Sequence, residues 1–273
     1  MYRIDKKWLE WRKELYKDDL PVRYLGIDEV SIRKGFKYAT VFYDLERSIV
    51  VGMVKGHKQR NVSSFLRRWG KDKCANVEAV CCDLWSAFHN SVRLYLKNAS
   101  LVFDKFHIFK YLGDAIDGVR RTEQNKAVAE KRDFIKGTRW ILLKKDLNKK
   151  QRNTLKELVN LNEPIAKAMI LKDDFERFYQ SETADEAVEV LAEWCEKCKE
   201  SGLTHFKKLA KRLKRWKDGI LAFFKYKITN GVSEGINNKI KVIKRKSYGF
   251  HDIDYFFNKI LQATGKIPKM IEL

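Results

Sequence analysis

The chain has 273 residues, of which 44% are hydrophobic and 12% aromatic, so it can bury a sizeable core and is not expected to be disordered. No apolar run approaches the roughly 18 residues of a membrane span, which excludes a transmembrane protein. Lys and Arg number 57 against 36 Asp and Glu, a formal net charge of +21, and this balance favours a polyanionic partner, nucleic acid ahead of an anionic membrane surface.

The first part of the chain predicts a short helix followed by three strands. Residues 1–20 carry Trp8, Trp11 and Leu15 at helical spacing and read as an amphipathic helix. Three strand-like stretches follow, separated by the turn-prone Lys34-Gly35 and by residues 46–48: VRYLGIDEVSI, FKYATVFYDLE and SIVVGMV. The short connections predict an antiparallel meander.

A helix capped by Asn61 would then cross over to a strand at residues 77–82. In such a sheet the first and fourth strands are neighbours, so Asp28 in the first and Asp83 at the end of the fourth would converge. Their repulsion would need a cation. Taken singly, each has a structural alternative: Asp28 as a strand-end residue beside a cation, and Asp83 as the N-cap of a helix starting at Leu84.

After a helix to Lys97 and a strand at residues 100–103 comes the sequence Asp-Lys-Phe-His. Asp104 and His107 have two readings. Either they lie near a functional site as accessory residues, or Asp104 caps a helix and His107 packs.

Residues 108–225 are almost wholly helical in pattern, with helices predicted at 108–146, 149–171, 184–200 and 204–226, the first broken near Gly137. Trp140 and Trp194 could stack on bases, but tryptophans in helical stripes are more often core. The last of these helices has an apolar stripe and a basic face made of Lys207, Lys208, Lys211, Arg212, Lys214 and Arg215. Such a helix can lie along a phosphate backbone.

The cysteines suggest a reducing environment. There are five, an odd number, and no signal-like apolar stretch follows Met1, so a cytoplasmic setting fits best. Cys195 and Cys198 form a C-x-x-C, but a structural zinc needs four ligands, and adjacent Cys81 and Cys82 are poorly spaced to supply the rest. We therefore expect Cys195 and Cys198 to face a helical core.

A helix from about Val232 would carry the aliphatic stripe Val232, Ile236, Ile240 and Ile243. Glu234 points the other way, and its face also carries Asn230, Asn237, Asn238, Lys241 and Arg245. A single carboxylate among amides and bases could hold a metal ion while the bases hold a polyanion. The alternative is a solvated face with an incidental Glu. A break at residues 247–250 and a closing helix follow.

Four separated stretches together resemble the catalytic region of bacterial insertion-sequence transposases of the ISL-three family: YLGIDEVSIRKGFKYATVFYDLE, CCDLWSAF, VFDKFHIFKYL and TNGVSEGINNKIKVIKRKSYGF. The match covers about residues 22–260. It implies an α/β fold, an RNase H-like mixed sheet with a large all-helical insertion before the last catalytic helix. The expected division is an N-terminal helix at 1–21, the core at 22–106 and 227–273, and the insertion at 107–226.

The resemblance also implies a catalytic and metal-binding triad of Asp28, Asp83 and Glu234. Divalent metal, Mg²⁺ with Mn²⁺ as a substitute, would support cleavage and strand transfer of DNA phosphodiesters. Lys241 and Arg245 would clamp the phosphates, and Asn238 would be an accessory residue. DNA is the expected partner, with a homo-oligomer as the active complex.

The chain departs from the family pattern in one respect. Full-length members carry an N-terminal zinc-finger and helix-turn-helix region, whereas about 20 residues precede the first strand here, so a truncated copy or a fragment is expected. Two other functions stay open: a non-catalytic nucleic-acid-binding protein, and a general metal-dependent nuclease on the same fold.

Overall fold

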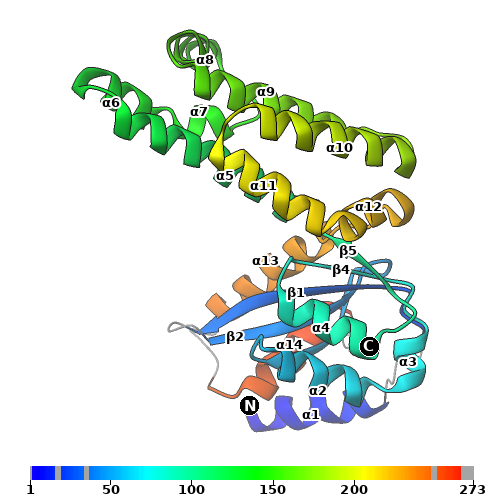
Figure 1. The fold of residues 1–273 in the computed structure, drawn as a ribbon. Coiled ribbons are helices and arrows are strands. Elements are labelled where there is room, and N and C mark those ends of the chain that lie inside the picture. Colours follow the sequence, from blue (N-terminus) through cyan, green and yellow to red (C-terminus); the bar gives the residue numbers. More distant parts are fainter. Residues whose placement is uncertain (1, 16–19, 34–36, 247–250, 266–273) are drawn as a thin grey trace. The chain divides into compact units, whose positions relative to one another are not determined.

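The computed structural model describes residues 2–15, 20–33, 37–246 and 251–265 (Figure 1). The turn predicted at residues 34–35 and the break at 247–250 lie outside these ranges. The chain forms two compact units, one comprising Met1–Asp104 and Tyr226–Leu273 and the other Lys105–Lys225. Within the described residues, no helix is long and apolar enough to cross a bilayer.

The first unit contains a five-stranded mixed sheet in the order β3-β2-β1-β4-β5. The first three strands form the predicted antiparallel meander, and β4 and β5 run parallel to β1. This confirms the predicted α/β, RNase H-like mixed sheet. The strands are β1 (Tyr24–Arg33), β2 (Lys37–Asp44), β3 (Ile49–Lys55), β4 (Ala79–Cys82) and β5 (Ser100–Phe103).

An apolar core lies on each face of the sheet, and helices cover both. Successive side chains of a strand point to opposite faces, so β1 contributes to both cores. One core contains Leu25 and Ile27 of β1 and lies under α2 (Gln59–Trp69) and α4 (Ser86–Tyr95), beside the short α3 (Lys71–Ala75). The other contains Val30 and Ile32 and lies under α1 (Tyr2–Leu15), α13 (Gly231–Lys246) and α14 (Ile253–Ala263).

The structure contradicts the predicted Asn61 cap and the alternative reading of Asp83 as a cap. Helix α2 begins at Gln59, so Asn61 sits inside its first turn, where its side-chain oxygen accepts a hydrogen bond from the Lys58 amide at 3.2 Å. Helix α4 begins at Ser86, with Trp85 rather than Asp83 in the capping position. The capping role of Asp83 is therefore excluded.

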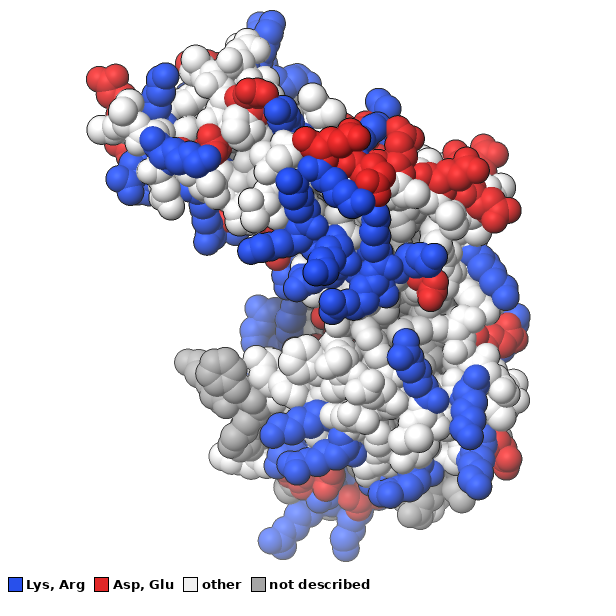
Figure 2. Space-filling view, in the orientation of Figure 1, with Lys and Arg blue, Asp and Glu red and all other residues white. Residues whose placement is uncertain are grey.

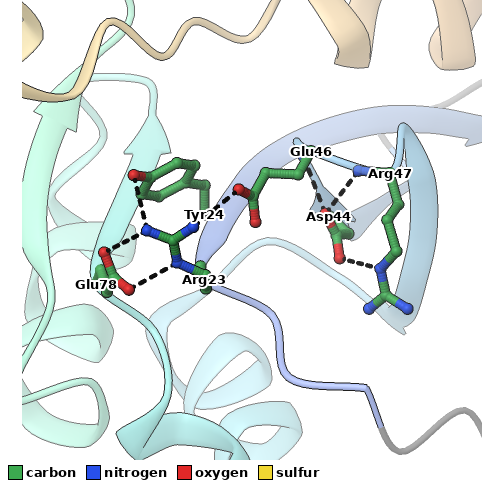
Figure 3. A network of polar contacts seen from close by, with 6 residues as sticks. All are labelled: Arg23, Tyr24, Asp44, Glu46, Arg47 and Glu78. Carbon is green, nitrogen blue, oxygen red and sulfur yellow. Dashed lines mark hydrogen bonds and ion pairs between the residues drawn. The ribbon is translucent and has the colours of Figure 1, made fainter.

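Polar contacts tie the sheet together near the start of β1 (Figure 3). Arg23, just before β1, donates to both carboxylate oxygens of Glu78, just before β4, at 2.7 and 3.2 Å. At the turn after β2, buried Asp44 accepts from the backbone amides of Glu46 and Arg47 at 2.9 Å. Because the first contact spans two parallel strands, it helps to fix their register.

The second unit is all-helical, as predicted. Its helices are α5 (Lys105–Lys126), α6 (Ala129–Gly137), α7 (Arg139–Leu143), α8 (Lys149–Leu161), α9 (Glu163–Phe178), α10 (Ala184–Glu200), α11 (Thr204–Arg215) and α12 (Lys217–Tyr226). The predicted helix at 149–171 is two helices, because Asn162 caps α9 by accepting from the Ile165 amide at 3.0 Å. The predicted helix at 204–226 likewise divides, at Trp216.

The aromatic core of this unit includes Trp194, whose indole N–H donates to the Leu171 carbonyl at 2.8 Å. Cys195 and Cys198 are fully buried beside it, as predicted. Trp140 differs from the expectation that it belongs to the core: its side chain on α7 is 70% exposed.

Candidate active site

Three aspartates occupy equivalent positions on three neighbouring strands. Ile27 of β1 is in register with Cys82 of β4, which is in register with Phe103 of β5. Asp28, Asp83 and Asp104 each come next in the chain. The parallel sheet therefore brings the predicted Asp28 and Asp83 to adjacent positions and adds Asp104, the accessory candidate.

Helix α13 is held against β1 through the side chain of Asp28. One carboxylate oxygen of Asp28 accepts from the Asn237 amide nitrogen at 2.9 Å and lies 3.2 Å from the Ser233 hydroxyl, which has a nearer acceptor in the Asn230 carbonyl at 2.6 Å. Ser233 and Asn237 are four residues apart and so lie on one face of the helix. The Asn237 side-chain oxygen in turn accepts from the Tyr43 hydroxyl of β2 at 2.8 Å. The helical pattern predicted Asn237 on the same face as Glu234, and in the structure its side chain bonds to both Asp28 and Tyr43.

The start of α13 is fixed by Asn230, which the sequence had placed on the polar face of the helix. Instead it precedes the helix and is 5% exposed. Its backbone amide donates to Asp104 at 3.3 Å, and its side-chain amide donates to the Ile27 carbonyl at 3.4 Å. Asp104, itself 4% exposed, thus links β5 to the helix that carries Glu234. No pattern in the sequence predicted this link.

The acids create a negative field within the sheet. Burial, followed by the charges of Asp83, Asp104 and Asp28, raises the pKa of the Cys82 thiol. Burial and the charge of Asp28 also raise the pKa of Tyr43 well above its ordinary value, so this phenol stays protonated and can donate to Asn237. Three separate carboxylates therefore act on one buried position.

Glu234 lies one residue after Ser233 in the first turn of α13, and it is exposed. Asn238, Lys241 and Arg245 are also exposed on this helix, and Lys241 donates to the Asn238 side chain at 3.4 Å. The buried stripe includes Ile236 and Ile240, as predicted. The polar face thus combines one acid with cations that are accessible to a ligand.

Carboxylate oxygens are the ligands that Mg²⁺ prefers, so the donor types of Asp28, Asp83 and Glu234 fit this ion. Their side chains, however, are engaged with protein groups: Asp28 with α13, and Asp83 with the Leu84 amide at 2.5 Å. Among the described residues, no three His, Cys, Asp or Glu side chains form a ready metal cluster. All three residues therefore fit in chemistry, Asp28 and Asp83 also fit in strand register, and the assembly of the triad around metal stays a prediction.

The predicted basic face is present on α11 in the second unit. Lys and Arg side chains gather along this helix in the space-filling view (Figure 2). All six predicted residues are exposed: Lys207, Lys208, Lys211, Arg212, Lys214 and Arg215. One is already paired, since Lys214 donates to Glu196 of α10 at 2.8 Å. His107, the other accessory candidate, is half-buried on α5 of this unit and contacts the Phe106 ring edge-on.

The fold and the site together define the RNase H-like class. The features are a mixed sheet with acids at neighbouring strand positions, a further acid on a helix packed against the sheet, and an all-helical insertion. A family model described as a transposase matches residues 25–260. The chain belongs to this family, the ISL-three transposases.

Curated relatives support the assignment. The transposase for insertion sequence element IS1001 of Bordetella parapertussis is 32% identical over 247 residues, which cover 89% of this chain and 61% of the relative. The transposase for insertion sequence element IS1557 of Mycobacterium tuberculosis is 25% identical over 256 residues, which cover 84% of this chain and 57% of the relative. The chain therefore spans about three fifths of the length of these relatives.

Proposed function

We propose that this chain carries the catalytic part of an insertion-sequence transposase, which cleaves DNA phosphodiester bonds at the element ends and joins those ends to target DNA. Asp28, Asp83 and Glu234 would be the ligands of two Mg²⁺ ions, with Mn²⁺ as a substitute. The observation that carries the proposal is the register of Asp28 and Asp83 on adjacent parallel strands, with α13 bonded directly to Asp28.

Each group in the site would have a distinct task. When bound, the metal ions would activate the attacking oxygen and stabilise the leaving oxygen. Asn237 would hold the Asp28 carboxylate in one orientation through its hydrogen bond. Lys241 and Arg245, exposed on the helix that carries Glu234, would bind phosphates of the reacting strand.

The basic face of α11 would bind DNA away from the reacting bond. Phosphate contacts of this kind supply affinity and position but little sequence information. The four cations Lys207, Lys208, Lys211 and Arg215 are exposed on the face, whereas Lys214 must first leave Glu196. We therefore expect strong, weakly sequence-dependent binding.

Product analysis tests the function. Purified protein is incubated with supercoiled plasmid, and separately with a pre-cleaved DNA end and a target duplex, in Mg²⁺, Mn²⁺ or chelator. We expect metal-dependent nicking of the plasmid and joining of the pre-cleaved end. Nicking without joining would indicate a general nuclease, and binding without either reaction would indicate a non-catalytic nucleic-acid-binding protein.

A further inference from the structure

A recessed pocket opens between α5 and α11 within the second unit. It has a volume of about 280 Å³ and is lined by Tyr111 and Asp114 of α5 and by His205, Lys208 and Arg212 of α11. The three α11 residues are spaced by three and four positions, so they lie on one face of that helix. This face is turned toward α5, so the pocket is formed by the packing of the two helices.

The guanidinium of Arg212 is held in place by two aromatic rings. Its central carbon lies 4.7 Å from the Tyr111 ring centroid and 5.4 Å from that of Trp216. The two rings are themselves 6.1 Å apart and tilted by 44°. Cation–π contacts on two sides reduce the freedom of an exposed side chain, so Arg212 presents a fixed planar donor.

One wall of the pocket is the His205 imidazole, whose position depends on the close approach of the two helices. The His205 ring lies over Gly118, where a Cβ atom would come within 2.4 Å of the imidazole Nδ1. The His205 Nε2 is 3.1 Å from the Thr122 hydroxyl, which donates its own proton to the Gly118 carbonyl. This arrangement fixes the imidazole as a wall of the pocket.

The lining combines what a nucleotide requires. Lys208 and Arg212 supply positive charge for a phosphate, Tyr111 supplies a ring for a base, and Asp114 supplies an acceptor for a base amino group. The volume of about 280 Å³ lies just below the usual range for ligand pockets, about 300–1,000 Å³. A space of this size is too small for a base pair.

We propose that the pocket formed by Tyr111, Asp114, His205, Lys208 and Arg212 binds a single unpaired nucleotide of the DNA substrate. Lys208 and Arg212 hold its phosphate, and the base stacks on the face of the Tyr111 ring that Arg212 does not cover. The inference rests on the proposed function in taking DNA as the ligand. It adds that the protein prefers DNA with an unpaired nucleotide over a continuous duplex.

The test measures binding by fluorescence anisotropy in chelator, without any reaction. The probes are a short labelled duplex carrying one unpaired nucleotide and the fully paired duplex of the same sequence. The wild type should bind the first about 5- to 100-fold more tightly, the gain expected from stacking one base on an aromatic ring. Arg212→Ala and Tyr111→Ala should bring this ratio close to one, whereas Tyr111→Phe, which keeps the ring, should preserve it.

Lys207→Ala is the matched control, because Lys207 is exposed on the same helix and does not line the pocket. It should weaken binding of both DNAs alike and leave the ratio unchanged. Equal affinity of the wild type for the two DNAs would overturn the proposal, as would an Arg212→Ala ratio equal to that of Lys207→Ala. Arg212 is exposed, so its loss should not unfold the protein, and circular dichroism checks this.

The outcome is separable from that of the proposed function. A preference for the unpaired nucleotide without metal-dependent nicking would overturn the catalytic proposal and support the pocket. Nicking and joining without a preference for the unpaired nucleotide would support the catalytic proposal and overturn the pocket proposal.

Discussion

At the scale of single residues, the site depends on contacts that have no signature in the sequence. Asp28 and Asp83 could be selected because each ends or interrupts an apolar strand, where a carboxylate is costly without a partner. Asn230 could not be selected, because its role arises from bonds to Asp104 and Ile27, which are 126 and 203 residues away in the chain. Such contacts follow from tertiary structure and not from periodicity.

Asn237 is predicted to position Asp28, so its truncation should impair metal binding as well as activity. We expect Asn237→Ala to lower Mn²⁺ affinity, measured by electron paramagnetic resonance, and nicking by about 10- to 100-fold, as is usual when a partner of a metal ligand is lost. Val242→Ala, which truncates an exposed, uncharged side chain of the same helix, is the control. Equal Mn²⁺ affinities for the two variants would argue against this role.

Asp117 of α5 is predicted to stabilise the helical unit. Burial alone would raise its pKa, but Arg120, Arg121 and Arg139 surround the carboxylate and lower the pKa below the ordinary value. Removing it leaves Arg120 buried without this partner, so Asp117→Ala should cost about 3–5 kcal/mol of unfolding free energy at neutral pH, against little for exposed Asp133→Ala.

The pH dependence of this effect has a definite sign. Because the folded-state pKa of Asp117 is depressed, its stabilisation is fully present above the unfolded carboxyl pKa of about 4 and declines as the pH falls through the folded value. Denaturant titrations should therefore show the gap between wild type and Asp117→Ala narrowing below about pH 4. A gap that stayed constant down to the lowest pH at which the protein is folded would show that the ion pairs do not cause it.

At the scale of elements, the sequence was most informative about the sheet. Alternating and apolar runs predicted all five strands, and the short connections predicted the meander, because a strand imposes a period of two over a few residues. The helix breaks at Asn162 and Trp216 were missed, since the apolar stripe continues across both. Trp140 was predicted to be in the core. Helical spacing alone does not show whether an aromatic side chain on a short helix is buried or exposed.

The salt dependence of DNA binding tests the basic helix α11. If about six phosphates are neutralised, affinity should fall about 1,000-fold between 50 and 200 mM salt, because each contact releases condensed counterions. Lys211→Ala should reduce the slope by about one, and Lys214→Ala by less, since Lys214 is already paired with Glu196. Anisotropy titrations across this range give both slopes. An equal reduction of the salt slope in the two variants would contradict the pairing of Lys214 with Glu196.

At the scale of the whole molecule, the chain separates its tasks between two units. The unit with the sheet carries the acids, and the all-helical unit carries the α11 face and the proposed nucleotide pocket. Substitutions on α11 should therefore change DNA binding more than chemistry, whereas those at Lys241 and Arg245, in the unit with the acids, should change both. The relatives extend well beyond the matched region, so we treat recognition of the element ends separately from the chemistry proposed for Asp28 and Asp83.

We predict that Asp83 acts in the chemical step and not in DNA binding. Asp83→Asn keeps the size of the side chain but removes the charge that would hold a metal ion. Nicking of supercoiled DNA should fall by orders of magnitude, while DNA affinity in chelator should stay the same or rise, because one negative charge has left a phosphate-binding surface. Exposed Asp72→Asn should change neither. Full nicking activity in Asp83→Asn would show that Asp83 is not a catalytic residue.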